Sequence, residues 1–285
     1  MRYDDRMTTK SDQAPAFSVA VVDSGSSGDF PVLPGINLSN EGAIDDVSDR
    51  CGHGDAVAST ILGIAPAVGI VPVKVTDRRG VLRDRDVLTT ALEWILDHHA
   101  RLAIGVVSIA LGDQSNLASD AELRGSALQR RIAALRAAGV LTVAPAGNWR
   151  RLHQGRGEGM VWPGILREVV SVGEARRGPE GLRLSPASQR LRATPEGVCA
   201  TTIFTEAAPP GETSGAAAAI AGVLARLAAA DRSGGAEAAL TALLRIRRVA
   251  LDEEGIAWPA ILAEDVAAGS TPAALRLRPE PGSTP

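Results

Sequence analysis

The sequence predicts an α/β fold, a three-layer domain with a mostly parallel central sheet and helices on both faces. Short runs of β-branched and apolar residues alternate with helical patterns along the chain, as expected for consecutive βαβ units. The β-rich runs are apolar on both faces, which is typical of strands buried in a parallel sheet. In such a sheet, functional groups are expected at the carboxyl ends of the strands.

Five runs are expected to form the buried strands. They span residues 17–22, 70–75, 102–109, 140–144 and 169–172. Two amphipathic helices are expected between them, because apolar residues recur at helical spacing at Leu88, Leu92, Ile95 and Leu96 and at Leu128, Ile132 and Leu135. Residues 214–230 (SGAAAAIAGVLARLAAA) are small and apolar nearly all round, which predicts a helix buried at the centre of the domain.

A length of 285 residues suits a single large α/β domain. We expect this domain to span residues 16–268. The polar residues 1–15 predict a flexible N-terminal tail, and the proline-containing residues 269–285 predict a flexible C-terminal tail.

The composition excludes several classes of protein. With 45% hydrophobic residues the chain is not intrinsically disordered, and a formal net charge of −3 provides no broad basic field for nucleic acid or an anionic membrane. No run reaches about 18 uninterrupted apolar residues, and the first residues lack the apolar run of a secretory signal. We therefore expect a cytoplasmic protein with no nucleic-acid or membrane partner. Cys51 and Cys199 are expected to be reduced, although a single disulfide stays open.

Four polar side chains are expected at one edge of the sheet. Asp23 ends the first strand, and His53 begins an apolar helix between two glycines. Asn148 follows the strand at 140–144, and Ser214 begins the buried helix. Taken singly, each is more simply a turn or helix-start residue. Together, an acid, a base, an amide donor and a hydroxyl in this chain order predict a hydrolase with a serine nucleophile.

This order and the residues around it resemble the subtilisin-like serine peptidases. The matching segments are residues 21–25 (VVDSG), 53–58 (HGDAVA), 144–148 (APAGN) and 213–216 (TSGA). The resemblance extends from about residue 17 to about residue 230. It implies a subtilisin-like fold and a serine endopeptidase that forms an acyl-enzyme.

The resemblance also implies the roles of individual residues. Asp23, His53 and Ser214 would form the catalytic triad, and Asn148 would donate a hydrogen bond in the oxyanion hole. Residues 107–112 (VSIALG) resemble the edge strand that pairs with substrate in this family. The residues expected to bind substrate are Ser108, Ala110, Leu111, Gly112, Asp113, Ala146 and Gly147.

Four residues near the triad depart from the family pattern. Asp55 replaces the usual Thr, Glu212 the usual Gly, Gly215 the usual Met and Ala218 the usual Pro. If the carboxylates of Asp55 and Glu212 point inward, they raise the pKa of His53. Otherwise both are solvated loop residues.

Signals of substrate preference oppose one another. Asp113 favours a basic substrate residue, whereas Trp149 and Val161 favour an apolar one. A basic loop follows Asn148 and either guides an acidic peptide or is simply solvated; it contains Arg150, Arg151, His153 and Arg156. Cys51, two residues before His53, either makes the site redox-sensitive or is a small buried thiol.

We expect a selective intracellular protease that processes a peptide or protein substrate, such as a peptide precursor. Selectivity is expected because an unrestrained general protease without a pro-segment would endanger its host. A catalytically impaired peptide-binding pseudoenzyme and a peptide ligase or macrocyclase are the alternatives. No cofactor is expected. No metal is expected, because no Cys/His cluster has zinc spacing and the stretch between His53 and Ile70 is too short for the family's calcium-binding insertion. An accessory or inhibitory protein stays open as a further partner.

Overall fold

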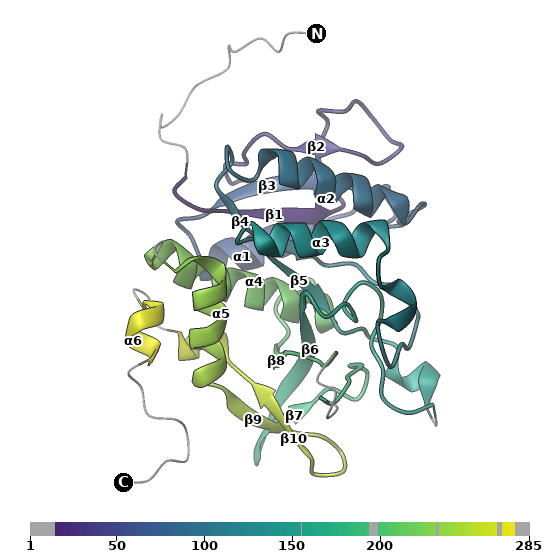
Figure 1. The fold of residues 1–285 in the computed structure, drawn as a ribbon, viewed down its shortest axis with the longest axis vertical. Helices are drawn as coiled ribbons and strands as arrows, with labels where there is room; N and C mark the ends of the chain where they lie inside the picture. Colours follow the sequence, from purple (N-terminus) through teal and green to yellow (C-terminus); the bar gives the residue numbers. More distant parts are fainter. Residues whose placement is uncertain (1–14, 155, 194–198, 232–233, 267–269, 277–285) are drawn as a thin grey trace.

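The computed structural model describes residues 15–154, 156–193, 199–231, 234–266 and 270–276. Within these residues the strands form one sheet with the order β2-β3-β1-β4-β5-β6-β7-β9-β10-β8, and β6 also pairs with β8 (Figure 1). The strands are β1 (Ser18–Asp23), β2 (Ile36–Asn37), β3 (Gly69–Lys74), β4 (Ile104–Ile109), β5 (Leu141–Pro145), β6 (Val169–Gly178), β7 (Gly181–Leu184), β8 (Ile203–Glu206), β9 (Arg248–Leu251) and β10 (Ala257–Ala260).

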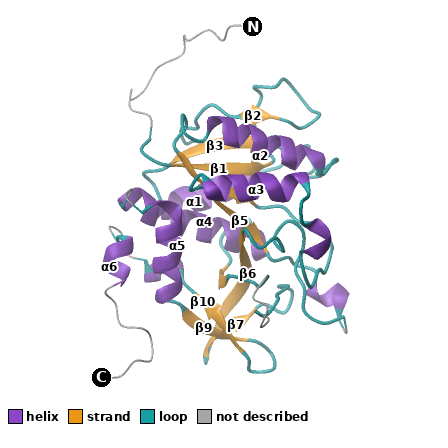
Figure 2. Cartoon of the chain, in the orientation of Figure 1, coloured by secondary structure: helices purple, strands orange, loops and turns teal. Residues whose placement is uncertain are grey.

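The centre of the sheet is parallel, as predicted. Strands β3, β1, β4, β5 and β6 pair in parallel in that order. All five predicted strands form, with ends shifted by one or two residues or, in β6, extended. The antiparallel pairs β6–β7 and β9–β10 were not predicted. Strands β7, β9 and β10 are short and partly exposed, so they lack the apolar run that marks the five predicted strands; they gather at the end of the molecule opposite β2 (Figure 2).

The helices are α1 (His53–Ile64), α2 (Asp86–His98), α3 (Ala127–Ala137), α4 (Glu212–Ala230), α5 (Gly235–Arg245) and α6 (Pro272–Arg276). Short 3-10 turns occur at Ala121–Leu123, Arg150–His153 and Ala263–Asp265.

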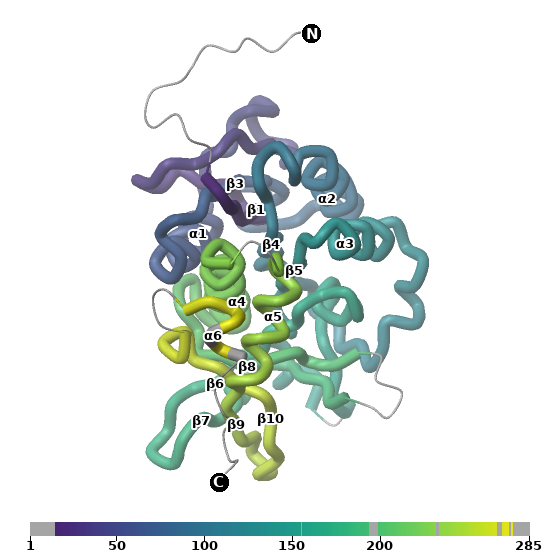
Figure 3. The backbone as a smooth tube through the Cα atoms, turned by 60° about the vertical axis from the view of Figure 1, so that its left-hand side comes forward, coloured from purple at the N-terminus to yellow at the C-terminus, as the bar shows by residue number. Residues whose placement is uncertain are grey.

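Alternate residues of β1 face two separate apolar cores. Val19 and Val21 pack with α1, α4 and α5, whereas Ala20 and Val22 pack with α2 and α3. Figure 3 shows these two groups of helices on opposite sides of β1 and β4. The predicted three-layer α/β architecture is therefore confirmed.

Helix α4 runs through the domain centre, as its composition predicted. Its small residues allow close packing on α1, since a Cβ on Gly222 would lie 3.2 Å from the carbonyl oxygen of Ile61. By length and hydropathy α4 resembles a membrane span, but most of its apolar window is buried inside the domain. Such burial is typical of a core helix in a folded domain.

The expected C-terminal tail differs from the structure in part. Residues 272–276 form α6, and the side chain of Leu275 is buried in the same core as α5. Residues 267–269 and 277–285, and residues 1–14 of the expected N-terminal tail, lie outside the described residues. The helix is only five residues long, so no apolar periodicity marks it in the sequence.

Candidate active site

The carboxyl ends of β1, β4 and β5 meet the first turns of α1 and α4 at one cleft. The cleft has a volume of about 300 Å³. Asp23, His53, Asn148 and Ser214 all line it, so the structure brings together the four side chains singled out in the sequence.

Asp23 and His53 form a close pair. Nδ1 of His53 lies 2.8 and 2.9 Å from the two carboxylate oxygens of Asp23, which is buried. The backbone N–H of Ser24 donates to Asp23 at 2.7 Å, and the Ser24 hydroxyl accepts from the N–H of Gly54 at 2.9 Å. The end of β1 is thus tied to the start of α1. This geometry directs Nδ1 to the acid and leaves Nε2 of His53 as the nitrogen that can accept a proton.

The pKa of His53 is raised above its ordinary value. Burial of the imidazole disfavours its charged form, but the hydrogen bond to Asp23 and the negative charges of Asp23 and Asp49 outweigh this effect. Asp49 is held by three backbone N–H groups, those of Cys51 at 2.8 Å and of Gly52 and Asp55 at 2.9 Å. Asp49 therefore shapes the turn before α1, and its charge helps to raise the pKa of His53, the first residue of α1.

Sequence reasoning missed Asp49 and considered two other carboxylates. The Asp55 side chain accepts hydrogen bonds from the hydroxyl of Ser26 and from the N–H groups of Ser27 and Gly28, so it holds the 26–28 loop. Glu212 is exposed at the start of α4. Neither is among the groups that raise the pKa of His53. The sequence does contain a signal for a carboxylate that caps this turn: an Asp lies four residues before His53, in a segment that also contains a glycine.

Ser214 lies in the first turn of α4, where backbone N–H groups have no partner within the helix. Its hydroxyl donates to the carbonyl oxygen of Ala110 at 3.1 Å. The hydroxyl hydrogen therefore points toward Ala110 and must turn toward His53 before His53 can take it. The helix N-terminus also favours negative charge that develops next to Ser214.

Two of the departures from the family pattern lie in α4 itself. A Cβ on Gly215 would overlap the carbonyl oxygen of Ala208, so this backbone leaves no room for a side chain after Ser214. Ala218 is buried and continues the helix without a break. Both residues fit the local packing of this chain.

Asn148 is oriented by the residue before Ser214. Its side-chain oxygen accepts from the N–H of Thr213 at 3.1 Å and from the Thr213 hydroxyl at 2.6 Å. With the oxygen held in this way, the amide NH₂ group is the part of Asn148 that is available to a substrate in the cleft.

Two expected substrate-binding residues lie outside the cleft lining. Ser108 is buried in β4 and pairs with Val21 of β1 and Val143 of β5, so β4 is a central strand and not an edge strand. Ala146 is also buried, and its N–H donates to the carbonyl of Val172. The other five line the cleft: Ala110, Leu111, Gly112, Asp113 and Gly147.

The Val161 side chain lies close to two glycines of the cleft lining, Gly112 and Gly147. Trp149 and Val161 also line the cleft, and a Cβ on Gly112 would lie 2.8 Å from the Val161 side chain. A Cβ on Gly147 would overlap Val161 as well. Asp113 forms an ion pair with Arg85, so its charge is already compensated. Val161 therefore presents an apolar surface to the cleft beside these two glycines.

The structure places both cysteines as free thiols, with Cys51 exposed at the cleft and Cys199 buried. Among the described residues, no group of three His, Cys, Asp or Glu side chains is placed to hold a metal ion.

Comparison with known proteins is consistent with this geometry. The Subtilase family model matches residues 15–252. A thermostable alkaline protease of Halalkalibacterium halodurans is 27% identical over 199 residues, which are 66% of this chain and 49% of the relative. The chain thus spans about half the length of this curated relative.

Solved structures share the fold. A lanthipeptide protease superimposes with a TM-score of 0.63 at 22% identity, covering 92% of this chain and 88% of the other. The prenylagaramide maturation protease PagA superimposes with a TM-score of 0.60 at 21% identity, covering 82% and 84%. A psychrophilic protease named S41 gives a TM-score of 0.61 at 22% identity, covering 81% and 82%.

Proposed function

Because the chain belongs to the subtilase family, we propose that it is a serine endopeptidase in which Asp23, His53 and Ser214 form the catalytic triad. The pairing of His53 with buried Asp23, in a cleft that also contains Ser214, is the observation that supports this most strongly.

The proposed reaction follows from these positions. His53 takes the proton of the Ser214 hydroxyl as its oxygen attacks the peptide carbonyl carbon, and Asp23 stabilises the imidazolium that forms. The Asn148 amide and the N–H of Ser214 donate hydrogen bonds to the oxyanion. The C–N bond then breaks as His53 returns the proton to the leaving amine. Water, activated by His53, cleaves the resulting ester and frees Ser214.

We further propose that the substrate is a peptide precursor. Two proteins of similar fold are named as a prenylagaramide maturation protease and a lanthipeptide protease. The apolar Val161 side chain beside Gly112 and Gly147 supports a preference for a small substrate residue there, and so a selective enzyme over a general one. The cytoplasmic location expected from the sequence belongs to this proposal and is tested by cell fractionation.

The decisive experiment is labelling with a fluorophosphonate probe, which reacts only with an activated serine. Wild type should be labelled with a rate that rises with pH, and Ser214→Ala should not be labelled. Absence of Ser214-dependent labelling at neutral and alkaline pH would identify a pseudoenzyme. If the enzyme is active, mass spectrometry of the products separates hydrolysis from transfer of the acyl group to an amine.

A further inference from the structure

Gln189 is a buried polar residue in the stretch that follows β7, and the proposed reaction does not use it. Its side chain is only 1% exposed. A buried carboxamide is costly unless its donors and its acceptor are hydrogen-bonded. All of the hydrogen bonds of this side chain go to two other segments of the chain, and both of these segments contribute residues to the catalytic cleft.

The first of these segments carries Asn148. The backbone N–H of Gln189 donates to the carbonyl oxygen of Gly147 at 2.7 Å. The side-chain oxygen of Gln189 accepts from the backbone N–H of Trp149 at 3.3 Å. Gln189 is therefore bonded to the residue on each side of Asn148. The Asn148 side chain itself is bonded to Thr213, so backbone and side chain are held by different residues.

The backbone at Gly147 also packs directly against the Gln189 carboxamide. Gly147 has a φ of +116°, a conformation that favours glycine. A Cβ at this position would lie 2.2 Å from Oε1 of Gln189, so only a residue without a side chain allows this contact. The segment that carries Asn148 thus rests on Gln189 and has little room to move toward it.

The second segment continues from Asp113, which lines the cleft. Nε2 of Gln189 donates to the carbonyl oxygen of Ser115 and to the side-chain oxygen of Asn116, both at 2.9 Å. These two bonds use both amide hydrogens, and they fix which end of the carboxamide faces Trp149. One buried amide group therefore ties the Asn148 segment to the segment after Asp113.

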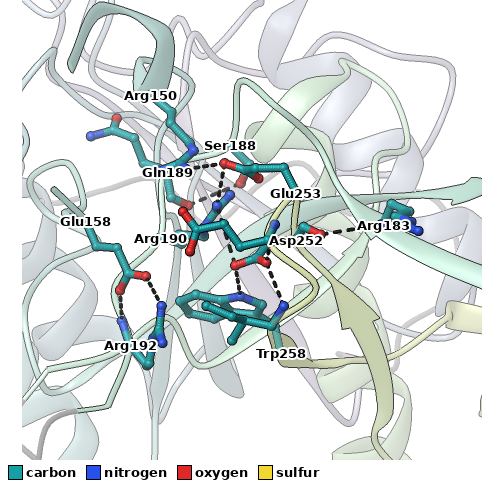
Figure 4. Close-up of polar contacts among 12 residues, drawn as sticks. Arg150, Glu158, Arg183, Ser188, Gln189, Arg190, Arg192, Asp252, Glu253 and Trp258 are labelled. Carbon is teal, nitrogen blue, oxygen red and sulfur yellow. Dashed lines mark hydrogen bonds and ion pairs between the residues drawn. The ribbon is translucent and has the colours of Figure 1, made fainter. Parts of the chain in front are cut away.

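Gln189 is itself firmly held. Figure 4 shows Glu253 bonded to both Arg150 and Arg190, which follow Trp149 and Gln189 in the chain. Arg190 is 2% exposed and lies 2.8 Å from Glu253. The backbone N–H of Arg150 also donates to the carbonyl oxygen of Ala187 at 3.2 Å. These contacts keep the stretch around Gln189 beside the segment that it supports.

We propose that Gln189 is a positioning residue of the oxyanion hole, which holds the backbone on both sides of Asn148 and so fixes the place of its amide group. This rests on the proposed function, in which Asn148 donates to the oxyanion, and adds to it a residue that acts only through Asn148. Such support matters because a displacement of about 1 Å in a catalytic group can lower the rate by about 10²-fold.

The kinetic test replaces the carboxamide of Gln189 by an apolar group of similar length. Gln189→Met should lower kcat on a peptide substrate by at least about tenfold, within the limit of about 10²–10³-fold set by loss of an oxyanion-hole asparagine. KM should change less than kcat. In a protein that already carries Asn148→Ala, Gln189→Met should lower kcat by less than about twofold, because the group that it positions is gone.

Thr201→Val is the matched control for the loss of a buried hydrogen bond. Thr201 is 4% exposed, and its hydroxyl bonds to the backbone N–H of Leu191 and to the sulfur of Met160. Its removal should lower the free energy of unfolding, as Gln189→Met also does, but should leave kcat unchanged. A purely structural role for Gln189 predicts the same behaviour for both variants.

Hydrogen exchange measured by mass spectrometry tests the same support without catalysis. In Gln189→Met the backbone N–H of Trp149 loses its acceptor, so amides of residues 147–150 should exchange faster than in wild type. Thr201→Val should leave their exchange unchanged. If Gln189→Met does not fold, Gln189→Asn gives the same comparisons, since its shorter side chain cannot reach both segments.

Three results would each overturn the proposal: equal losses of kcat with and without Asn148, a loss in Thr201→Val as large as in Gln189→Met, or unchanged exchange of residues 147–150 in Gln189→Met. Failure of the proposed function is a separate result. It would appear as absence of fluorophosphonate labelling in wild type, whereas the exchange measurement decides without activity whether Gln189 holds the Asn148 segment.

Discussion

The side-chain oxygen of Asn148 accepts two hydrogen bonds from Thr213, one from its backbone N–H and one from its hydroxyl. This relationship joins the loop that follows β5 to the residue before Ser214 in α4. It fixes the Asn148 amide group toward the cleft and couples the proposed oxyanion donor to the segment that carries the nucleophile.

Thr213→Val removes the hydroxyl donor and keeps the shape of the side chain. We expect kcat to fall by about fivefold, because the Asn148 amide is then held by the backbone N–H alone and one net hydrogen bond is worth about 1 kcal/mol. Asn148→Ala sets the upper limit, with an expected loss of about 10²–10³-fold, the size known for loss of the oxyanion-hole asparagine in subtilisin itself. Steady-state kinetics on a peptide substrate measure both.

A double-mutant cycle shows whether Thr213 acts by positioning Asn148 or has a separate effect on catalysis. If Thr213 acts through Asn148, Thr213→Val should lower kcat only slightly in a protein that already carries Asn148→Ala. Equal costs in both backgrounds would contradict this coupling.

Asp49→Asn should shift the acid limb of the pH–kcat/KM profile to lower pH. The charge of Asp49 helps to raise the pKa of His53, and His53 must be neutral to act as a base, so loss of that charge lowers the pH at which activity appears. Glu212→Gln is the control, because exposed Glu212 is not among the groups that act on His53. Identical profiles for Asp49→Asn and wild type would remove Asp49 from this role.

The same interaction predicts the sign of a stability effect. The pKa of His53 is raised in the folded state, so its pairing with Asp23 contributes stability that is fully present below the unfolded pKa of histidine. This contribution is lost as pH rises through the raised pKa. Wild type should therefore lose more unfolding free energy than His53→Ala as pH rises through that window, as measured by urea denaturation.

The parallel core and the central helix could be predicted because their residues carry unambiguous patterns. Strand β1 is apolar throughout, and α4 has small apolar residues on every face. The triad candidates could be predicted for a related reason, since strand ends and helix starts converge at one edge of such a sheet. Asp23, His53, Asn148 and Ser214 all lie there.

Other features depend on contacts between distant segments that no local pattern records. Ser108 resembles a substrate-pairing residue in sequence but is enclosed between β1 and β5. Buried Arg190 pairs with Asp252 and Glu253, which lie far along the chain and which only the fold brings to it. Asp49 acts on His53 through the shape of a turn, which composition does not specify.

Val161→Ala should broaden the choice of the residue before the cleaved bond. Val161 fills the space between Gly112 and Gly147, so wild type should prefer glycine or alanine at that substrate position. Removal of two methyl groups should improve kcat/KM for a valine or leucine substrate, relative to alanine, by about tenfold or more. Val249→Ala, at an exposed residue of β9, is the matched control and should leave the ratio unchanged. A ratio that does not move in Val161→Ala would place this subsite elsewhere.

Gly215→Ala tests whether the start of α4 tolerates any side chain after Ser214. The new Cβ would overlap the carbonyl oxygen of Ala208, and that backbone cannot move freely because Ala208 also accepts from the N–H of Gly211 at 2.8 Å. We expect a loss of about 1–3 kcal/mol in unfolding free energy, together with slower fluorophosphonate labelling because Ser214 is displaced. Thermal and urea denaturation measure the first effect.

Gly63→Ala is the control for the loss of glycine in a helix. Gly63 is exposed in α1 and has no atom within 4 Å of an added Cβ, so the same substitution should stabilise the protein by about 0.4–1 kcal/mol. The chemical change is the same at both glycines, so the opposite signs of the expected changes in unfolding free energy follow from the packing alone. If Gly215→Ala were as stable and as reactive as wild type, the close approach of Ala208 would not constrain Ser214, and the substitution of the family's usual Met by glycine would need another explanation.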